Sequence, residues 1–151
     1  MYKNILVIAP HADDEILGCG GTISKFSKKN INIYVAVMTN ASKGDKKLFN
    51  KSSINNIRKE CLYANKRLGV KKVFFFDFPD NRFDTVALLD IIKIIEKIKN
   101  KNKPEIIFTH YEKDLNIDHR ITYEALITAT RPFKKETVKK IFSFEIPTST
   151  E

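Results

Sequence analysis

Five short apolar runs alternate with four longer stretches of helical periodicity in this chain of 151 residues. The runs are rich in Ile, Val and Phe and cover residues 4–9, 32–39, 72–77, 105–110 and 140–146. Four of them are nearly continuous, as is typical of strands that are covered on both faces. Apolar residues recur at helical spacing in 14–29, 53–69, 85–101 and 117–130. This order predicts an α/β fold: a Rossmann-like three-layer sandwich with a mainly parallel sheet of about five strands and helices on both faces.

Turn and capping signals mark the ends of the predicted helices. Ser53 can cap the second helix, and Gly69 can end it because glycine tolerates the left-handed conformation that often closes a helix. Asp84 and Thr85 open the third helix, and Pro104 lies just beyond its end. No repeat and no domain boundary interrupts the pattern, so residues 1–151 are expected to form a single domain.

The composition limits the classes of function. The net charge is +9, but 22 of the 27 basic residues are lysines, scattered over predicted helix ends and turns. Nucleic-acid surfaces usually rely on arginine and on aromatic side chains among the charges, so no nucleic-acid partner is expected. No apolar run approaches the roughly 18 residues of a membrane span. The two cysteines make no disulfide framework, which favours a reduced, cytoplasmic protein.

Histidines and aspartates gather where the predicted strands end. In doubly wound sheets the ligand site lies outside the carboxyl ends of the strands. All three histidines and six of the nine aspartates follow one of the first four strands, in residues 10–15, 39–44, 77–82 and 109–120. Because these segments meet at one edge of a parallel sheet, the pattern indicates an active site there.

Two of these segments together suggest a metal site. His11 and Asp14 are three residues apart at a strand-to-helix junction, and His119 opens the fourth helix. Two histidines and one carboxylate leave a divalent cation with an open coordination position, which is a catalytic arrangement. Zn²⁺ is the default ion for such a set, although Fe²⁺, Mn²⁺ or Co²⁺ could occupy it. Asp13 is next to a ligand and could take a proton from water there.

Four blocks of the sequence carry a resemblance to a known family. Residues 10–15, Pro-His-Ala-Asp-Asp-Glu, resemble the signature of the PIG-L/LmbE-like de-N-acetylases. The motif Arg58-Lys59-Glu60 with Ala64, Leu68 and Gly69 is similar to a family helix, and residues 78–84 and 114–120 look like its later blocks. The family comprises zinc hydrolases that remove acetyl groups from N-acetylglucosamine-type amides. The resemblance therefore implies an amide hydrolase acting on a small-molecule amino-sugar conjugate.

By position, the resemblance implies three metal ligands, His11, Asp14 and His119. It implies that Asp13 is the general base and that Arg58 holds the sugar.

The remaining candidate residues surround these positions. Asn81 and Arg82 lie where a polar substrate could be met. Many family members have His-x-x-His at the second cluster, whereas the first of these positions is Asn116 here. Asparagine can donate a hydrogen bond to an oxyanion but cannot act as an acid. Asp118 or His110 would then be an auxiliary acid or an orienting group, or Asp13 would act as both base and acid.

Two alternatives to an active hydrolase stay open. Residues 146–151 resemble an internal family segment, so the chain could be a truncated member and a catalytically inactive remnant of the same fold. A receiver-type phosphoacceptor domain that binds Mg²⁺ would account for Asp13, Asp14, Asp77 and Thr109, but it leaves the histidines without a role. Gly18, Cys19, Gly20 and Gly21 suggest close helix packing rather than a dinucleotide site, because they lie inside the first helix. A homo-oligomer is compatible with the sequence.

Overall fold

The computed structural model describes residues 2–40 and 51–147. The strands in this part of the chain are β1 (Asn4–Ala9), β2 (Asn32–Thr39), β3 (Lys72–Phe78), β4 (Ile106–His110) and β5 (Lys140–Phe144). The helices are α1 (Asp14–Ser27), α2 (Lys51–Arg67), α3 (Leu88–Asn102) and α4 (Ile117–Ala129), with a short 3₁₀ helix η1 (Phe83–Thr85). Residues 41–50, between β2 and the described start of α2, lie outside the described residues.

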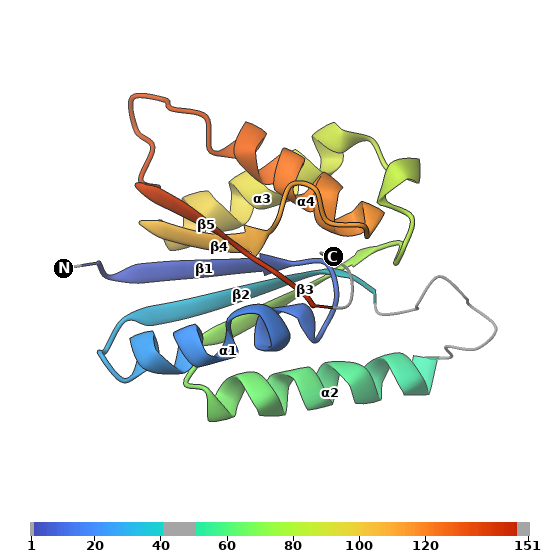
Figure 1. Ribbon diagram of the computed structural model, residues 1–151, viewed down its shortest axis with the longest axis horizontal. Helices are drawn as coiled ribbons and strands as arrows, with labels where there is room; N and C mark the ends of the chain where they lie inside the picture. Colours follow the sequence, from blue (N-terminus) through green and yellow to red (C-terminus); the bar gives the residue numbers. More distant parts are fainter. Residues whose placement is uncertain (1, 41–50, 148–151) are drawn as a thin grey trace.

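The described strands form one sheet in the order β3-β2-β1-β4-β5, and every pair in it is parallel. Helices α1 and α2 cover one face of this sheet, and α3 and α4 cover the other (Figure 1). The predicted three-layer α/β fold is therefore confirmed. Strand β1 pairs with β2 on one side and with β4 on the other, so the chain changes direction beside β1. This is the topological switch point, where ligands bind in open α/β sheets.

Alternate residues of the central strands supply two separate cores. Leu6 and Ile8 of β1 face α3 and α4, where they pack with Ile95. Ile5 and Val7 face α1 and α2, in the cluster that contains Cys61. Because successive side chains of a strand point to opposite faces, a strand between two helical layers is apolar at every position. This explains the continuous apolar runs that predicted the strands.

Two helix starts differ from the sequence prediction. Ser53 lies inside α2, which already begins at Lys51 in the described chain, so its predicted capping role is wrong. Asp84 and Thr85 belong to η1, and α3 begins only at Leu88 because Val86 and Ala87 have extended backbone angles.

The predicted helix ends are confirmed. Gly69 follows α2 with a φ of +82°, the left-handed conformation expected of a glycine that closes a helix. Lys103 also has a positive φ, and it directly precedes Pro104. A residue before proline is disfavoured in the helical region, so α3 stops there.

None of the helices in the described ranges combines the length and the apolar character that a bilayer crossing requires.

Candidate metal centre and active site

The turn between β1 and α1 and the loop between β4 and α4 follow two neighbouring strands at the switch point. His11 and Asp14 come from the short turn between β1 and α1, and His119 comes from the first turn of α4. The two histidines are 108 residues apart in the sequence, yet their ring centroids are only 5.2 Å apart. The parallel order of β1 and β4 produces this contact, because both strands end at the same edge of the sheet.

Three side-chain atoms converge on one point. The Nδ1 atom of His11 is 3.0 Å from Oδ2 of Asp14. The Nε2 atom of His119 is 3.2 Å from the same oxygen and 3.2 Å from Nδ1 of His11. Ligands at 2.0–2.1 Å from a tetrahedral Zn²⁺ are separated by about 3.3 Å. The mutual distances of these three atoms therefore fit a shared divalent cation, and the structure brings the three predicted ligands together.

His11 and His119 each have a buried carboxylate next to the ring nitrogen that does not face Asp14. Nε2 of His11 lies 3.2 Å from Oδ2 of Asp118, and Nδ1 of His119 lies 3.0 Å from Oδ2 of Asp114. Metal-binding histidines almost always donate their second ring N–H to such a partner, which fixes the tautomer and the ring orientation. With their other ring nitrogens facing these carboxylates, His11 and His119 can direct the lone pairs of Nδ1 and Nε2, respectively, at the point that they share with Oδ2 of Asp14.

The electrostatics of the cluster favour positive charge. Burial alone would lower the pKa of His11, but hydrogen bonds to Asp118 and Asp14 outweigh it and raise this pKa to about 10. Burial would raise the pKa of Asp14, but hydrogen bonds from His11, His110 and His119 hold it well below its usual range. Since the cluster stabilises a proton among its carboxylates, a divalent cation at the same point would neutralise the same negative charge.

Asp118 also connects the metal cluster to the loop after β3. Its Oδ2 accepts the backbone N–H of Asn81 at 2.6 Å, and its Oδ1 accepts that of Phe83 at 3.0 Å. Asn81 has a φ of +54°, a left-handed conformation that asparagine tolerates better than most other non-glycine residues. Both oxygens of Asp118 are used in these contacts, so of its two predicted roles the geometry favours the orienting one.

His110 approaches the cluster from within the sheet. It is completely buried, it stacks on His119 with ring centroids 3.6 Å apart, and its Nε2 is 3.3 Å from Oδ2 of Asp14. Burial lowers the pKa of His110 against the opposing effect of Asp14. His110 therefore supports two ligand side chains from behind.

A cavity of about 640 Å³ opens beside the cluster, lined by the metal-cluster residues, by the loops after β3 and β4, and by α1 and α2. Asp13 faces this cavity next to the ligands, and it precedes α1 without using its carboxylate to cap the helix. Asn81 and Asn116 also line it. Nδ2 of Asn116 donates to Oδ1 of Asn81 at 3.2 Å, while Oδ1 of Asn116 caps α4 by accepting the N–H of Asp118.

Two predicted substrate residues take other positions. Arg58 donates to Oδ1 of Asp77 at 2.6 Å and to the carbonyl of Phe76 at 2.9 Å, so its guanidinium is held against the end of β3. Arg82 is exposed, and its carbonyl accepts the hydroxyl of Thr85. Neither arginine contributes to the lining of the cavity.

The sequence analysis missed three residues of the site. Asp80 is buried, lines the cavity and lies 3.6 Å from Nε2 of His11. Asp114 supports His119, and Glu15 accepts a hydrogen bond from Asn65 of α2 at 2.6 Å behind the cluster. Their positions in the sequence could have identified them. Asp80 and Asp114 both lie in segments that follow predicted strands, and Glu15 directly follows the candidate ligand Asp14.

The fold and the cluster together define a parallel α/β protein with a candidate metal centre at its switch point. The chain belongs to the PIG-L family, because the family model described as GlcNAc-PI de-N-acetylase matches residues 6–130. The family resemblance of the sequence is thereby confirmed, and the receiver-type alternative is wrong. Asp77, which that alternative required, is instead 79% exposed at the side chain and pairs with Arg58.

Several relatives are similar over most of this chain. The uncharacterized deacetylase YaiS of Escherichia coli (strain K12) is 30% identical over 97% of this chain and 76% of its own length. A probable N-acetyl-alpha-D-glucosaminyl L-malate deacetylase 2 of Bacillus cereus is 30% identical over 90% of this chain and 64% of its own length. The chain thus spans about two thirds to three quarters of these relatives.

A solved structure supports the same assignment. The N,N'-diacetylchitobiose deacetylase from Pyrococcus horikoshii, complexed with an inhibitor, superposes with a TM-score of 0.75 at 30% identity. The match covers 85% of this chain and 49% of that one. A conserved protein from Thermus thermophilus shares the fold with a TM-score of 0.76 at 23% identity, over 95% of this chain and 66% of that one.

Proposed function

We propose that this chain is a metal-dependent hydrolase that removes an acetyl group from an N-acetylglucosamine-type sugar or a related amide. The observation that carries the proposal is the convergence of Nδ1 of His11, Oδ2 of Asp14 and Nε2 of His119 at the edge of a cavity. The deacetylases among the relatives, two of them named for N-acetylglucosaminyl malate and diacetylchitobiose, support the substrate class.

His11, Asp14 and His119 would hold the cation, with Zn²⁺ favoured by two imidazoles and one carboxylate and Fe²⁺, Mn²⁺ or Co²⁺ as alternatives. The cation would supply Lewis acidity, which polarises an amide carbonyl and lowers the pKa of water. Asp118 and Asp114 keep the two imidazoles oriented toward Asp14. The free, buried thiols of Cys19 and Cys61 support a reducing compartment such as the cytoplasm.

Asp13 is suited to the proton transfers of amide hydrolysis. Its exposed carboxylate faces the cavity beside the ligands and can accept a proton from the attacking water. The same group can return that proton to the leaving nitrogen, since Asn116 cannot act as an acid. The amide N–H group of Asn116 can instead donate a hydrogen bond to the oxyanion. Asp80 and Asn81 offer hydrogen-bond partners to sugar hydroxyls in the same cavity.

Metal content and acetate release test the proposal together. We expect about one transition-metal ion per chain in the wild type and in Asp13→Asn, and loss of the ion in His119→Ala. Acetate release from N-acetylglucosamine conjugates should fall at least roughly 100-fold in Asp13→Asn, because the general base is removed. Asp90→Asn, an exposed aspartate of α3, is the matched control and should behave as the wild type.

Different failures contradict different parts of the proposal. A wild-type protein that takes up no transition metal after reconstitution would exclude the metal-dependent hydrolase. A protein that binds metal through His119 but hydrolyses no conjugate in a panel of N-acetylated amino sugars would support the inactive alternative.

A further inference from the structure

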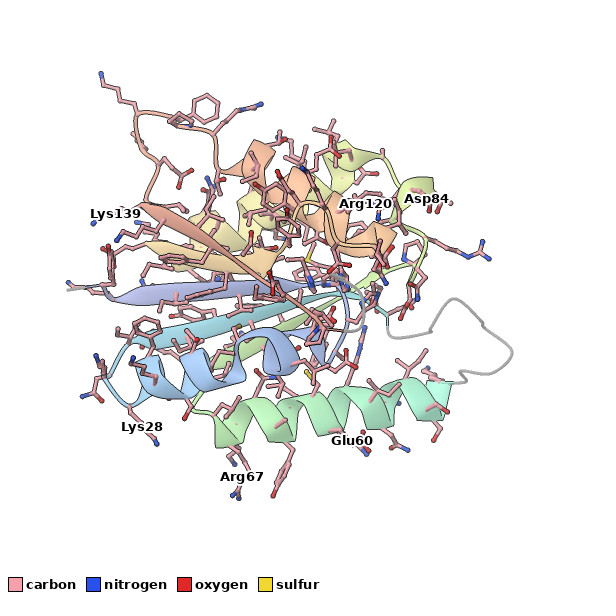
Figure 2. The ribbon with its side chains drawn as sticks, in the orientation of Figure 1. Lys28, Glu60, Arg67, Asp84, Arg120 and Lys139 are labelled. Atoms are coloured by element: carbon pink, nitrogen blue, oxygen red, sulfur yellow. The ribbon has the colours of Figure 1, made fainter. Side chains whose placement is uncertain are left out.

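Two asparagine side chains connect the loop after β3 to the first turn of α4 at the edge of the cavity. Nδ2 of Asn116 donates to Oδ1 of Asn81 at 3.2 Å, and Nδ2 of Asn81 donates to Oδ1 of Asp80 at 2.7 Å. All three residues line the cavity beside the metal cluster. Figure 2 shows the two segments next to each other, with Asp84 in the loop and Arg120 in the helix. We call the two hydrogen bonds from Asn116 through Asn81 to Asp80 the amide chain.

The direction of the amide chain is fixed at both ends. An amide has an oxygen that accepts and a nitrogen that donates, and its hydrogen-bond partners decide which way it lies. The oxygen of Asn116 accepts the backbone N–H of Asp118 at 2.8 Å, so its nitrogen faces Asn81. The nitrogen of Asn81 faces a carboxylate oxygen of Asp80, so its oxygen faces Asn116. Neither amide can be reversed without the loss of two hydrogen bonds.

The position of Asn81 is itself held by the residues around the metal cluster. Its backbone N–H donates to Oδ2 of Asp118 at 2.6 Å. Its neighbour Asp80 is buried and lies 3.6 Å from Nε2 of His11. Although Asn81 is exposed, the oxygen that faces Asn116 is therefore attached to two buried carboxylates at the cluster.

One N–H group of Asn116 remains for a substrate. The side-chain amide has two N–H groups, of which Asn81 accepts one, and the amide oxygen is occupied as the cap of α4. The half-buried side chain of Asn116 therefore presents a donor, and not an acceptor, to the cavity. A donor stabilises developing negative charge most effectively when it is oriented before the reaction.

We propose that Asn81 is a positioning residue for Asn116, because it holds the Asn116 amide with the second N–H group directed at the oxyanion formed during amide hydrolysis. The inference rests on the proposed function for the oxyanion and for its contact with Asn116. It adds that Asn81 acts on the chemical step through Asn116, beyond any contact of its own with a sugar hydroxyl.

Asn81→Gly and Asn116→Ser are the informative variants because each preserves the local backbone. Glycine tolerates the left-handed conformation of Asn81 and removes only the side chain. Serine can cap α4 but has no amide. Asn30→Gly is the matched control, since Asn30 is exposed and has a φ of +59° in the turn after α1.

The two variants and their combination form a double-mutant cycle on kcat for an N-acetylglucosamine conjugate. Asn116→Ser should lower kcat by about 100-fold, the usual effect of removing one oxyanion donor. Asn81→Gly should lower kcat by about three- to tenfold, because the hydrogen bond that orients this donor is lost. In the Asn116→Ser background, Asn81→Gly should lower kcat no further. Equal effects of Asn81→Gly in both backgrounds, or an effect on KM alone, overturn the proposal.

Two measurements that need no turnover separate this inference from the proposed function. In the isotope-labelled protein, the side-chain amide NMR signals of Asn116 should shift in Asn81→Gly and not in Asn30→Gly. A methylphosphonamidate of glucosamine has a tetrahedral, anionic phosphorus in place of the acetyl carbon, so it resembles the transition state. Relative to glucosamine, the metal-loaded Asn81→Gly variant should bind it about three- to tenfold more weakly than the wild type.

The combined outcomes distinguish the two proposals. Phosphonamidate binding that depends on Asn81 in a protein that hydrolyses nothing would contradict the proposed function and keep the positioning role. Hydrolysis by a protein in which Asn81→Gly changes neither the Asn116 signals nor the phosphonamidate affinity would overturn the positioning role alone.

Discussion

Asp114 and Asp118 illustrate how much of a candidate metal centre lies behind its ligands. Asp114 accepts the backbone N–H of Asn116 through Oδ1 at 2.9 Å and contacts Nδ1 of His119 through Oδ2. Arg120 holds the same loop by donating to the carbonyls of Asp114 and Leu115. The orientation of one imidazole therefore depends on a whole turn of the chain.

Asp114→Asn should weaken metal binding by about 10- to 100-fold, because the amide keeps the size of the carboxylate but loses its charge. Competition with a chromogenic chelator measures the affinity. Asp84→Asn is the control for the same substitution at an exposed position near the same end of the molecule (Figure 2). Unchanged affinity in Asp114→Asn would show that His119 is oriented by its packing on His110 alone.

At the level of single residues, local spacing brings two of the candidate ligands together but does not fix the direction of Arg58. His11 and Asp14 are separated by one turn of chain, so their meeting follows from the sequence. The direction of Arg58 depends on Asp77 and Phe76, which belong to another element and lie 19 and 18 residues away. Spacing within α2 contains no information about that contact.

Helix α1 packs closely against the sheet through a glycine. A Cβ atom at Gly18 would overlap the ring of Phe144 of β5, whereas a Cβ atom at Gly21 would meet no atom within 4 Å. The expectation that small residues permit close packing is confirmed for Gly18 and does not apply to Gly21. The helix also departs from helical angles at Cys19, next to this contact.

Gly18→Ala should lower the free energy of unfolding by about 1–3 kcal/mol, the usual cost of an added group in a packed core. Gly21→Ala should be neutral or stabilise by up to about 1 kcal/mol, since alanine favours the helix. Chemical denaturation of the two variants measures the difference. Phe144→Leu should recover part of the loss in Gly18→Ala, and equal stability of both alanine variants would contradict the packing argument.

The segment between α4 and β5 is attached to α3 by a nearly buried ion pair. Nζ of Lys99 pairs with Oε2 of Glu136, and Oε1 of Glu136 accepts the N–H groups of Thr137 and Val138. Partial burial would raise the pKa of Glu136, but the hydrogen bonds and the charge of Lys99 lower it below its ordinary value of 4.5. A lowered pKa in the folded state means that this carboxylate stabilises the fold above about pH 4.5 and loses that effect as the pH falls through the lowered value.

Glu136→Gln should therefore destabilise the protein by about 2 kcal/mol at pH 7, because Lys99 is left nearly buried without its partner. The difference from the wild type should shrink as the pH falls through the lowered pKa of Glu136, where the wild-type carboxylate becomes protonated as well. Urea denaturation over a series of pH values from 7 downward measures it. Lys99→Met added to Glu136→Gln should restore stability, and a difference that does not depend on pH would contradict the ion-pair argument.

Over the whole molecule, the metal cluster joins segments from both ends of the chain. The turn after β1 and the first turn of α4 meet at the switch point, and a shared cation would bind them together. Because the unfolded chain has no preformed site, binding adds directly to stability. The loss of any one ligand should remove this link between the two halves of the sheet.

A cation at 100 times its dissociation constant should stabilise the fold by about 2.7 kcal/mol. For a domain of this size we expect a rise in Tm of roughly 5–10 °C. Scanning calorimetry before and after removal of metal by a chelator tests this effect. His119→Ala should show no change on addition of Zn²⁺, and an equal rise in that variant would place the stabilising ion elsewhere.

The sequence by itself determined the layered α/β fold, the edge of the sheet that holds the site, and the spacing of His11 and Asp14. These features are local, because strand and helix periodicities and the residues after each strand can be followed along the chain. Only the tertiary structure decided the strand order, the place of Asp80, Asp114 and Glu15, and the position of Arg58. Each of these depends on side chains that are far apart in the sequence, whose contact arises only when the helices pack on the sheet.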